Sequence, residues 1–169
     1  ARANMATLNA IRKVNSGVDP LLTYAETANV PSPHIDDIRN DYIRMIAPLI
    51  PKYHEQASTK QVQDIFHLIN GELEKNKILH PMDIRIHLTQ SQFNSQHAIF
   101  MQDAAFLVDS EMILKEALSY SPKRQQIQYM LAAVKLQLNK PQEAVALLQD
   151  SIDNNPKIGE GWWRLAGVY

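Results

Sequence analysis

Apolar residues recur along the chain at the spacing of an α-helix. One segment shows this clearly, with apolar residues three or four positions apart at Val62, Ile65, Phe66, Ile69 and Leu73. Such spacing is typical of the buried face of a helix, whereas strict alternation of apolar and polar residues would indicate a strand. No convincing alternation of that kind is found. The pattern therefore predicts an all-α chain.

Prolines and residues that cap helices divide the chain into pieces of helix length. In the first half we expect four helices, at about 4–14, 19–28, 34–49 and 58–77, the last capped by Ser58 or Thr59. The first is expected to bury Ala6, Leu8, Ile11 and Val14. The third is expected to bury Ile35, Ile38, Tyr42, Met45 and Ile46. A rigid, non-helical link is expected at residues 30–33, where two prolines occur.

A regular pattern appears in the second half, where Pro122 and Pro156 are 34 residues apart. A small, a large apolar and a small residue precede each proline by 12, 8 and 5 positions. These residues are Ser110, Leu114 and Ala117 before the first proline, and Ala144, Leu148 and Ser151 before the second. Small residues at two of these positions let paired helices approach closely, and the large residue fills the space between them. Leu131–Ala132 and Leu165–Ala166 also recur at matching positions after the prolines.

Thirty-four residues is the period of the tetratricopeptide repeat, a helix–turn–helix unit. The sequence Trp162-x-x-Leu165-Ala166-x-x-Tyr169 resembles the first-helix signature of this repeat, with Ala in place of the usual Gly. The resemblance implies that Trp162 packs between helices, so its replacement by Ala should cost about 3–5 kcal/mol. The segment 81–122 has about seven residues more than one period, and we expect these at 102–109.

The expected fold is all-α, with about nine helices in helical hairpins stacked as a tetratricopeptide-like α-solenoid. Residues 1–80 are expected to form divergent N-terminal hairpins, and residues 81–169 tetratricopeptide-like repeats that continue them in one domain. The last repeat is truncated after its first helix. This predicts that the natural protein continues, and that the open C-terminal end permits self-association.

Charge and composition exclude several classes of protein. The chain has 17 Lys and Arg against 18 Asp and Glu, a net charge of −1. This balance argues against nucleic acid as a partner, because nucleic-acid binders normally carry a basic excess. The absence of cysteine excludes disulfides, thiolate zinc sites and cysteine nucleophiles. No apolar run approaches the ~20 residues that span a bilayer.

Residues that could perform catalysis are present but do not form a recognisable motif. No HExxH pattern and no glycine-rich phosphate loop is found among the residues. The acidic pairs Asp36–Asp37 and Glu72/Glu74 are expected at helix first turns and on solvated faces. We therefore predict no catalytic residue, no cofactor and no metal, and no enzymatic activity for this fragment. The histidines, expected at the surface or half-buried, are His34, His54, His67, His80, His87 and His97.

A binding groove is the remaining candidate. In repeats of this type the first helices line a concave surface that binds a protein or peptide. Counting from each proline places nine residues on this surface: Arg85, Leu88, Gln92, Gln96, Gln126, Tyr129, Gln137, Glu160 and Trp163. Five of them are the predicted groove residues: Arg85, Gln92, Gln126, Tyr129 and Trp163. Replacing either aromatic residue by Ala should weaken partner binding with little loss of stability. The alternative is that the protein's own next helix fills this groove.

Several residues form a second pattern along the chain. They are Asn4, Ala10, Leu22, Tyr24 and Ala28, Glu26 with Ile38-Arg39, Pro81-Met82-Asp83-Ile84-Arg85, and the repeat ends at Leu118–Pro122 and Asn154–Pro156. With these residues the chain resembles the soluble C-terminal tail of bacterial O-antigen ligase and polymerase-like membrane proteins. The resemblance implies a full-length protein in the bacterial inner membrane that ligates or polymerises lipid-linked glycan, with this domain soluble on one side. The family's catalytic loops would lie in the part absent here.

Two alternatives remain. The chain could be a free-standing tetratricopeptide adaptor or co-chaperone scaffold with no enzyme attached. It could also belong to a glycosyltransferase whose tail helps to bind the substrate or acceptor.

Overall fold

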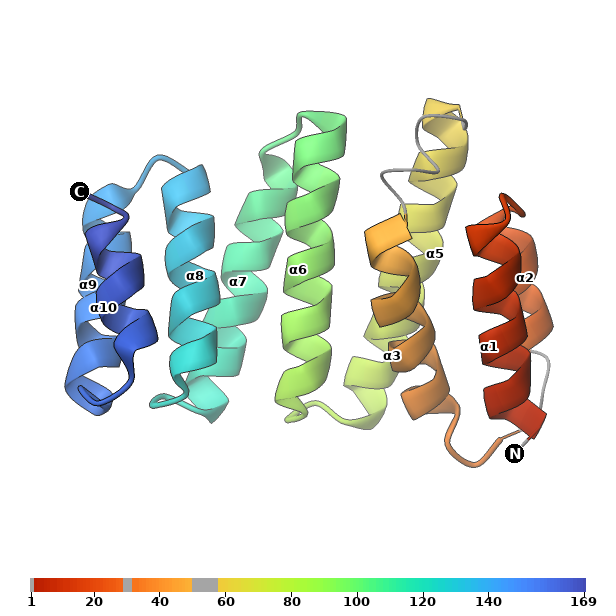
Figure 1. Cartoon of the computed structure of the whole chain (residues 1–169), viewed down its shortest axis with the longest axis horizontal. Helices are drawn as coiled ribbons and strands as arrows, with labels where there is room; N and C mark the ends of the chain where they lie inside the picture. Colours follow the sequence, from red (N-terminus) through yellow and green to blue (C-terminus); the bar gives the residue numbers. More distant parts are fainter. Residues whose placement is uncertain (1, 29–31, 50–57) are drawn as a thin grey trace. The chain divides into compact units, whose positions relative to one another are not determined.

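The computed structural model describes residues 2–28, 32–49 and 58–169 (Figure 1). Those residues form nine α-helices and one 3-10 helix, with no strand. The chain divides into two compact units, Ala1–Pro81 and Met82–Tyr169, called unit 1 and unit 2 below. The prediction of an all-α fold built from helical hairpins is confirmed. That the two segments form one continuous domain stays a prediction.

Unit 1 contains four of the α-helices. They are α1 (Arg2–Asn15), α2 (Pro20–Ala28), α3 (Ile35–Ile46) and α5 (Thr59–Leu79), with the 3-10 helix η1 (Ala47–Leu49) directly after α3. Tyr42 on α3 holds the α2 helix: its hydroxyl donates to the Pro20 carbonyl at 2.9 Å and lies 2.7 Å from Thr23 Oγ1. The Tyr42 ring also packs against Tyr24, with ring centroids 5.1 Å apart. The Tyr42 hydroxyl thus has hydrogen-bond partners, as is usual for a buried tyrosine.

The α5 helix begins directly after Ser58, one of the two residues that the sequence predicted as its cap. The Ser58 side chain accepts from the Gln61 backbone N–H, and the Gln61 side chain accepts from the Ser58 backbone N–H. This reciprocal capping box satisfies two amide groups at the helix start that would otherwise lack partners. All five apolar residues expected on the inner face of α5 are buried, as predicted.

Two apolar residues of unit 1 that were expected to be buried are exposed. Leu8 is 44% exposed and Met45 43% exposed. Thr7 and Ile43 are buried instead, so each helix presents a slightly rotated face to its neighbours. The rotation follows from packing on more than one helix at once, since α3 contacts α1, α2 and α5. Of the expected link at 30–33, residues 30 and 31 are outside the described residues.

The α3–α5 contact is polar where a repeat would place a small residue. Asn76 is buried; its side-chain amide donates to the Asp36 carbonyl at 2.7 Å and accepts from Arg39 at 3.3 Å. Arg39 Nε lies 2.7 Å from Glu72 Oε2. Both ends of the Asn76 amide therefore have partners, as burial requires. The repeat pattern fades before Pro81 because hydrogen bonds replace close packing of small residues there.

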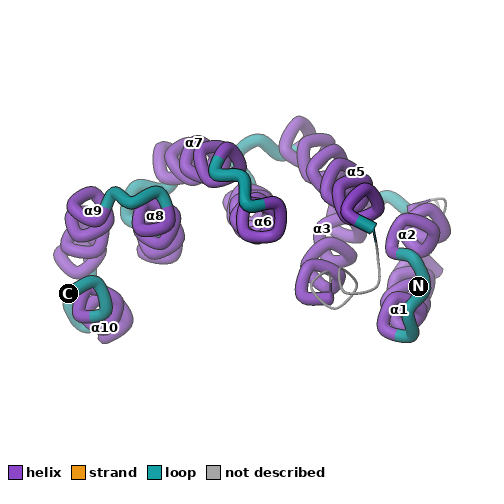
Figure 2. Tube along the Cα trace, turned by 90° about the horizontal axis from the view of Figure 1, so that it is seen from above, coloured by secondary structure: helices purple, strands orange, loops and turns teal. Residues whose placement is uncertain are grey.

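Unit 2 is a succession of helices joined by short turns. They are α6 (Ile84–Met101), α7 (Ala105–Tyr120), α8 (Gln125–Gln137), α9 (Pro141–Asn154) and α10 (Gly159–Ala166). Within this unit, α7 packs against α6 and α8, and α9 packs against α8 and α10. Seen from above, α6, α8 and α10 lie along one side and α7 and α9 along the other (Figure 2). The first helices of the hairpins therefore share one side of unit 2.

The small residues found in the sequence lie at the helix contacts. Ser110, Ala117, Ala144 and Ser151 are all fully buried. Ser110 Oγ donates to the Ser91 carbonyl at 2.8 Å, which fixes α7 against α6. The predicted small–large–small pattern is confirmed, because only small side chains allow two helix backbones to approach this closely.

Two of the seven extra residues of the first hairpin lie within the expected range 102–109, at the start of α7, and the other five lie before it in α6. The α6 helix has 18 residues against 13 in α8, and α7 has 16 against 14 in α9. The turns that join each pair are equally long, and each contains a residue with positive φ, Gln102 at 53° and Asn139 at 57°. The insertion therefore lengthens the helices, mainly α6 before Gln102, and leaves the turn unchanged.

Trp162 is not the buried packing residue that the sequence predicted. Its side chain is 52% exposed, and its indole N–H donates to the Pro156 carbonyl at 3.1 Å. Gly161 is the residue of α10 that is buried, and Leu165 and Val168 pack against the core below it. Because α10 meets α8 and α9 through this side, Trp162 points away from both helices.

Candidate functional site

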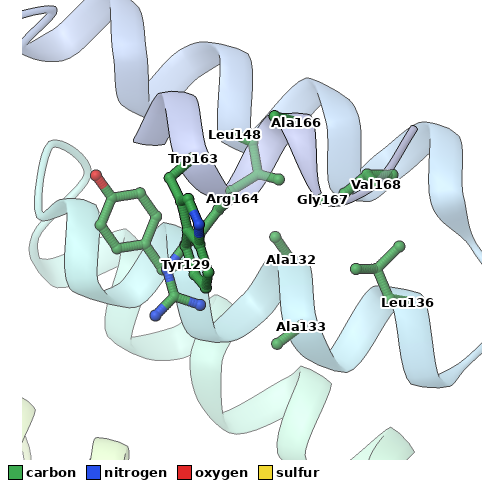
Figure 3. Close-up of a pocket in the computed structure, with 10 residues that line it drawn as sticks. All are labelled: Tyr129, Ala132, Ala133, Leu136, Leu148, Trp163, Arg164, Ala166, Gly167 and Val168. Atoms are coloured by element: carbon green, nitrogen blue, oxygen red, sulfur yellow. The ribbon is translucent and has the colours of Figure 1, made fainter. Parts of the chain in front are cut away.

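A pocket of about 430 Å³ lies between α8 and α10 in unit 2 (Figure 3). Its lining comes from both helices, with one residue of α9 beneath them. The lining residues are Tyr129, Ala132, Ala133, Leu136, Leu148, Trp163, Arg164, Ala166, Gly167 and Val168. The volume lies within the range of about 300–1,000 Å³ that is typical of ligand-binding pockets.

Tyr129 belongs to both the pocket and the core. It is only 6% exposed and packs in one cluster with Ala132, Ala144 and Leu148. A Cβ built on Gly161 would lie 3.3 Å from the Tyr129 hydroxyl oxygen, so this hydroxyl points at the backbone of α10. The expectation that Tyr129 could be truncated at little cost in stability is therefore wrong, because its ring is a core side chain.

Trp163 lies on the open side of the pocket. Its side chain is 74% exposed, although tryptophan is one of the largest apolar side chains. Figure 3 shows Trp163 and Tyr129 at one end of the pocket and Leu136 and Val168 at the other. Exposed aromatic surface beside an apolar hollow is typical of protein-interaction sites.

The one charged residue of the lining is neutralised within α10. The Nε and Nη2 atoms of Arg164 donate to Glu160 Oε1 at 2.9 and 2.7 Å. The same guanidinium lies 5.1 Å from the centre of the Tyr129 ring, a cation–π arrangement. Because the ion pair and the ring hold Arg164 in place, the pocket is apolar and carries no net charge at this position.

The five residues predicted for the groove do not all meet at this pocket. Tyr129 and Trp163 line it, whereas Arg85, Gln92 and Gln126 do not. The last three are exposed on α6 and α8. Arg85 forms an ion pair with Asp83, with 2.7 Å between Arg85 Nη2 and Asp83 Oδ2. A shared groove that includes all five residues stays a prediction.

The sequence interpretation missed several lining residues, above all Ala133 and Gly167. They occupy the same place in successive repeats, 34 residues apart and 11 residues after Pro122 and Pro156. Counting along the repeat could have found them, but a small residue carries no chemical signal of binding. Their importance lies in the space that small side chains leave open.

Two buried histidines have local structural contacts. His87 is fully buried, with Nδ1 3.0 Å from the Asp83 carbonyl and its ring edge-on to Tyr120. His97 stacks on Phe106, with ring centroids 3.8 Å apart. Neither was expected to be buried this deeply, and His54 lies outside the described residues. Residues 2–28, 32–49 and 58–169 contain no group of three or more His, Asp or Glu side chains that could hold a metal ion.

None of the helices in the part of the chain that the structure describes combines the length and the apolar character needed to cross a membrane.

Comparisons with known proteins agree with this architecture. Residues 107–167 match the family model described as the tetratricopeptide repeat. The structure is similar to the crystal structure of TTC0263, a thermophilic tetratricopeptide-repeat protein in Thermus thermophilus, with a TM-score of 0.64 and 18% sequence identity. That similarity covers 98% of this chain and 80% of the other.

Weaker similarities are found to two structures of MamA, one described as a point mutant and one as MSR-1 C2. Their TM-scores are 0.42 and 0.47, with 11% and 14% identity; each covers 99% of this chain, and 86% and 85% of the other chain respectively. The comparison with curated proteins finds no match. Residues 107–167 thus carry tetratricopeptide-repeat sequence, and the chain has the all-α, hairpin-built fold of tetratricopeptide-repeat proteins.

Proposed function

We propose that unit 2 is a protein–protein interaction module that binds a peptide segment of its partner. The partner inserts an uncharged apolar side chain into the pocket between α8 and α10. The observation that carries this proposal is the 74% exposed Trp163 beside an apolar pocket of about 430 Å³. A tryptophan in such a position is the residue type most often found to dominate binding energy.

The chemistry of the pocket favours an uncharged side chain. The side chains of Ala132, Ala133, Leu136 and Val168 offer only apolar surface. Arg164 is already paired with Glu160, so an acidic ligand would meet the Glu160 carboxylate as well as the guanidinium. An apolar side chain gives up no favourable hydration when it enters the pocket. It also removes apolar surface of Trp163 from water.

The test is a selection of linear peptides from a displayed library against the whole chain. Peptides enriched on the native protein should then bind at least about tenfold more weakly to Trp163→Ala, a loss of about 1.4 kcal/mol. They should also bind more weakly to Ala133→Phe, because the new ring fills the pocket. Ala133 is exposed on α8, so the larger side chain does not disturb the core.

Gln142→Ala is the matched control, because Gln142 is an exposed residue of α9 that neither lines the pocket nor belongs to the predicted groove. It should leave peptide binding unchanged. If the selected peptides bind equally well to the native chain, Trp163→Ala and Ala133→Phe, the pocket is not the binding site and the proposal fails.

A finer proposal concerns the protein to which the module belongs. We propose that it is attached to a bacterial membrane protein that ligates or polymerises lipid-linked glycan, and the support for this is the sequence resemblance, including Pro81–Arg85. In the structure Asp83 also accepts from the Arg85 backbone N–H as the N-cap of α6, so part of that motif has a local role. The alternative is a free-standing adaptor. The coding sequence upstream of Ala1 distinguishes the two proposals. Several apolar membrane spans encoded there would support attachment to a membrane protein, and a start codon directly before α1 would contradict it.

A further inference from the structure

A second pocket, of about 330 Å³, lies where the α6–α7 turn meets the C-terminal end of α8. It is called the turn pocket below. All of its lining residues belong to unit 2, and it shares none of them with the pocket between α8 and α10. The α6–α7 turn and the end of α8 lie at the same end of unit 2 (Figure 1). The turn pocket is therefore a separate hollow of the same unit.

The turn pocket combines apolar surface with exposed polar side chains. Ile99, Ala104 and Leu107 supply apolar surface, and Ile99 is 63% exposed. The polar side chains of the lining are Gln102, Asp103 and Gln137, all of them exposed. None of the lining residues is basic. This combination suits a side chain that has a hydrocarbon stem and a polar end.

Asp103 has one carboxylate oxygen available for a ligand. Its Oδ1 atom accepts from the Ala105 backbone N–H at 2.9 Å, at the start of α7. Its Oδ2 atom has no hydrogen-bond or ion-pair partner among residues 2–28, 32–49 and 58–169. Hydrogen bonds between a carboxylate and a cationic side chain are stronger than those between neutral groups. The polar end that suits Asp103 best is therefore a positive charge.

Two helix C-termini add to the negative charge around the turn pocket. The α6 helix ends at Met101 and the α8 helix at Gln137, and a helix C-terminus carries a partial negative charge that favours cations. The last turn of α6 contains no basic residue, and Lys135 in the last turn of α8 is already paired with Glu111 and Glu143. The start of α7 brings one opposing positive end. Two negative helix ends and a carboxylate outweigh it, so the surroundings favour a cation.

We propose that the turn pocket binds a lysine or arginine side chain of the partner peptide. The methylene stem lies on Ile99 and Leu107, and the charged end reaches Asp103. Long basic side chains commonly bury their stems along apolar surface and keep the charge among polar groups. This proposal deepens the proposed function and rests on it, because the same peptide fills the pocket between α8 and α10.

The width of α8 sets the spacing between the basic and the apolar residue of the peptide. Leu136 lines the pocket between α8 and α10, and the next residue, Gln137, lines the turn pocket. A peptide that fills both pockets crosses α8, which with its side chains is about 10–12 Å wide. An extended chain covers about 3.3–3.6 Å per residue, so the two side chains are about three or four residues apart.

The test uses the displayed library of random linear peptides, selected on the native chain. The enriched peptides should carry Lys or Arg about three or four residues from an apolar residue. Replacing that basic residue of the peptide by Gln should weaken binding to the native chain about two- to fivefold, the size expected for one exposed ion pair.

Asp103→Asn is the decisive variant. Asparagine keeps a side-chain oxygen for the Ala105 N–H and removes only the charge, so the start of α7 is preserved. With this variant, replacing the basic residue of the peptide by Gln should no longer change the affinity. Asp109→Asn is the matched control, because Asp109 is an exposed aspartate of α7 that lines neither pocket. The control should behave like the native chain.

Several results would overturn the proposal. They are enriched peptides that lack a basic residue at this spacing, and an equal effect of the Gln replacement on Asp103→Asn and on the native chain. A dimer that forms without peptide and is lost in Asp103→Asn would mean that a second copy fills the turn pocket, which also overturns the proposal. If the library yields no binding peptide at all, the proposed function fails as well.

The two proposals fail in different ways. Peptides that respond to Trp163→Ala and Ala133→Phe but not to Asp103→Asn would leave the proposed function standing and overturn the basic side chain in the turn pocket. Peptides that respond to Asp103→Asn but not to Trp163→Ala or Ala133→Phe would support the basic side chain and overturn the apolar side chain between α8 and α10.

Discussion

Gly161 shows how a single missing side chain positions α10. A Cβ at this residue would lie 2.9 Å from Ile152 Cγ1 and 3.2 Å from Ser151 Oγ. The first distance is shorter than real Cβ contacts, so the helix can approach α9 this closely only with glycine here. The position of Trp163 and Arg164 beside the pocket depends on this approach, because both residues follow on the same short helix.

Gly161→Ala is expected to destabilise the chain by about 0.5–2 kcal/mol. Overpacking costs about 1–3 kcal/mol, and replacing a helical glycine by alanine returns about 0.5–1 kcal/mol. Urea unfolding followed by tryptophan fluorescence measures the difference. Gly159→Ala is the matched control in the same helix, because a Cβ there meets nothing within 4 Å. If Gly161→Ala is as stable as the control, the close approach of α10 to α9 is wrong.

The two aromatic residues of the pocket should differ in their effect on stability. Tyr129→Ala is expected to cost about 3–5 kcal/mol, as for other large buried aromatic residues. Trp163→Ala should change the stability by no more than about 0.5 kcal/mol, since most of its side chain is in water. Thermal unfolding of both variants tests this ordering. A larger loss for Trp163→Ala would place that residue in the core and would contradict the open pocket.

At the scale of helices, α7, α8 and α9 are joined by an ion-pair network centred on the buried side chains of Lys135 and Glu111. Lys135 is 3% exposed and lies 2.9 Å from Glu111 Oε1, and it also contacts Glu143. Lys140 Nζ lies 3.0 Å from Glu111 Oε2. The charged side chains of the network come from all three helices, so the network fixes how these helices are aligned along one another. A buried lysine without its carboxylates would be strongly unfavourable.

The network makes the stability of the fold depend on pH in the acidic range. Hydrogen bonding from Lys115, with further bonds from Lys135 and Lys140, lowers the pKa of Glu111 from 4.5 to about 2, against the opposing effect of burial. Because the folded pKa is lower, Glu111 stabilises the fold above pH 4.5 and loses this effect as the pH falls toward 2. The native chain should therefore lose more stability over this interval than Glu111→Gln.

Glu111→Gln should also be less stable at neutral pH. Removing one partner of a buried ion pair costs about 3–5 kcal/mol, and the remaining contact with Glu143 places the expected loss at the lower end. Urea unfolding at about pH 7 and at several values below the ordinary carboxyl pKa measures both effects. Parallel pH profiles for the native chain and the variant would show that Glu111 has no part in the acid response.

At the scale of the whole molecule, the helices and the repeat register could be predicted from sequence. The spacing of Val62 to Leu73 and the capping residue Ser58 are local signals, and the structure follows them. The offsets before Pro122 and Pro156 correctly gave the contact residues of α7 and α9, because close packing admits few residue types.

The errors arose where tertiary packing decides the outcome. Leu8, Met45 and Trp162 are large apolar residues at plausible spacing, yet all three are exposed. Which side of a helix is buried depends on the helices that it contacts. A helix that contacts several others rotates slightly about its own axis, and this changes which side chains are buried. The pocket was predictable only through its aromatic residues. The alanines and glycine that create its space carry no signal without the structure.

Because Lys135 is buried, its chemical modification can be used to measure the opening of the helices around it. Amine-reactive acylating reagents modify lysines whose Nζ is accessible and unprotonated, and here the ammonium is enclosed between α7, α8 and α9 with two carboxylates. Exposed lysines such as Lys115 should therefore be labelled quickly, whereas labelling of Lys135 should await separation of α8 from α9. Mass spectrometry of time-resolved acylation would then follow the opening of one hairpin in an otherwise folded chain.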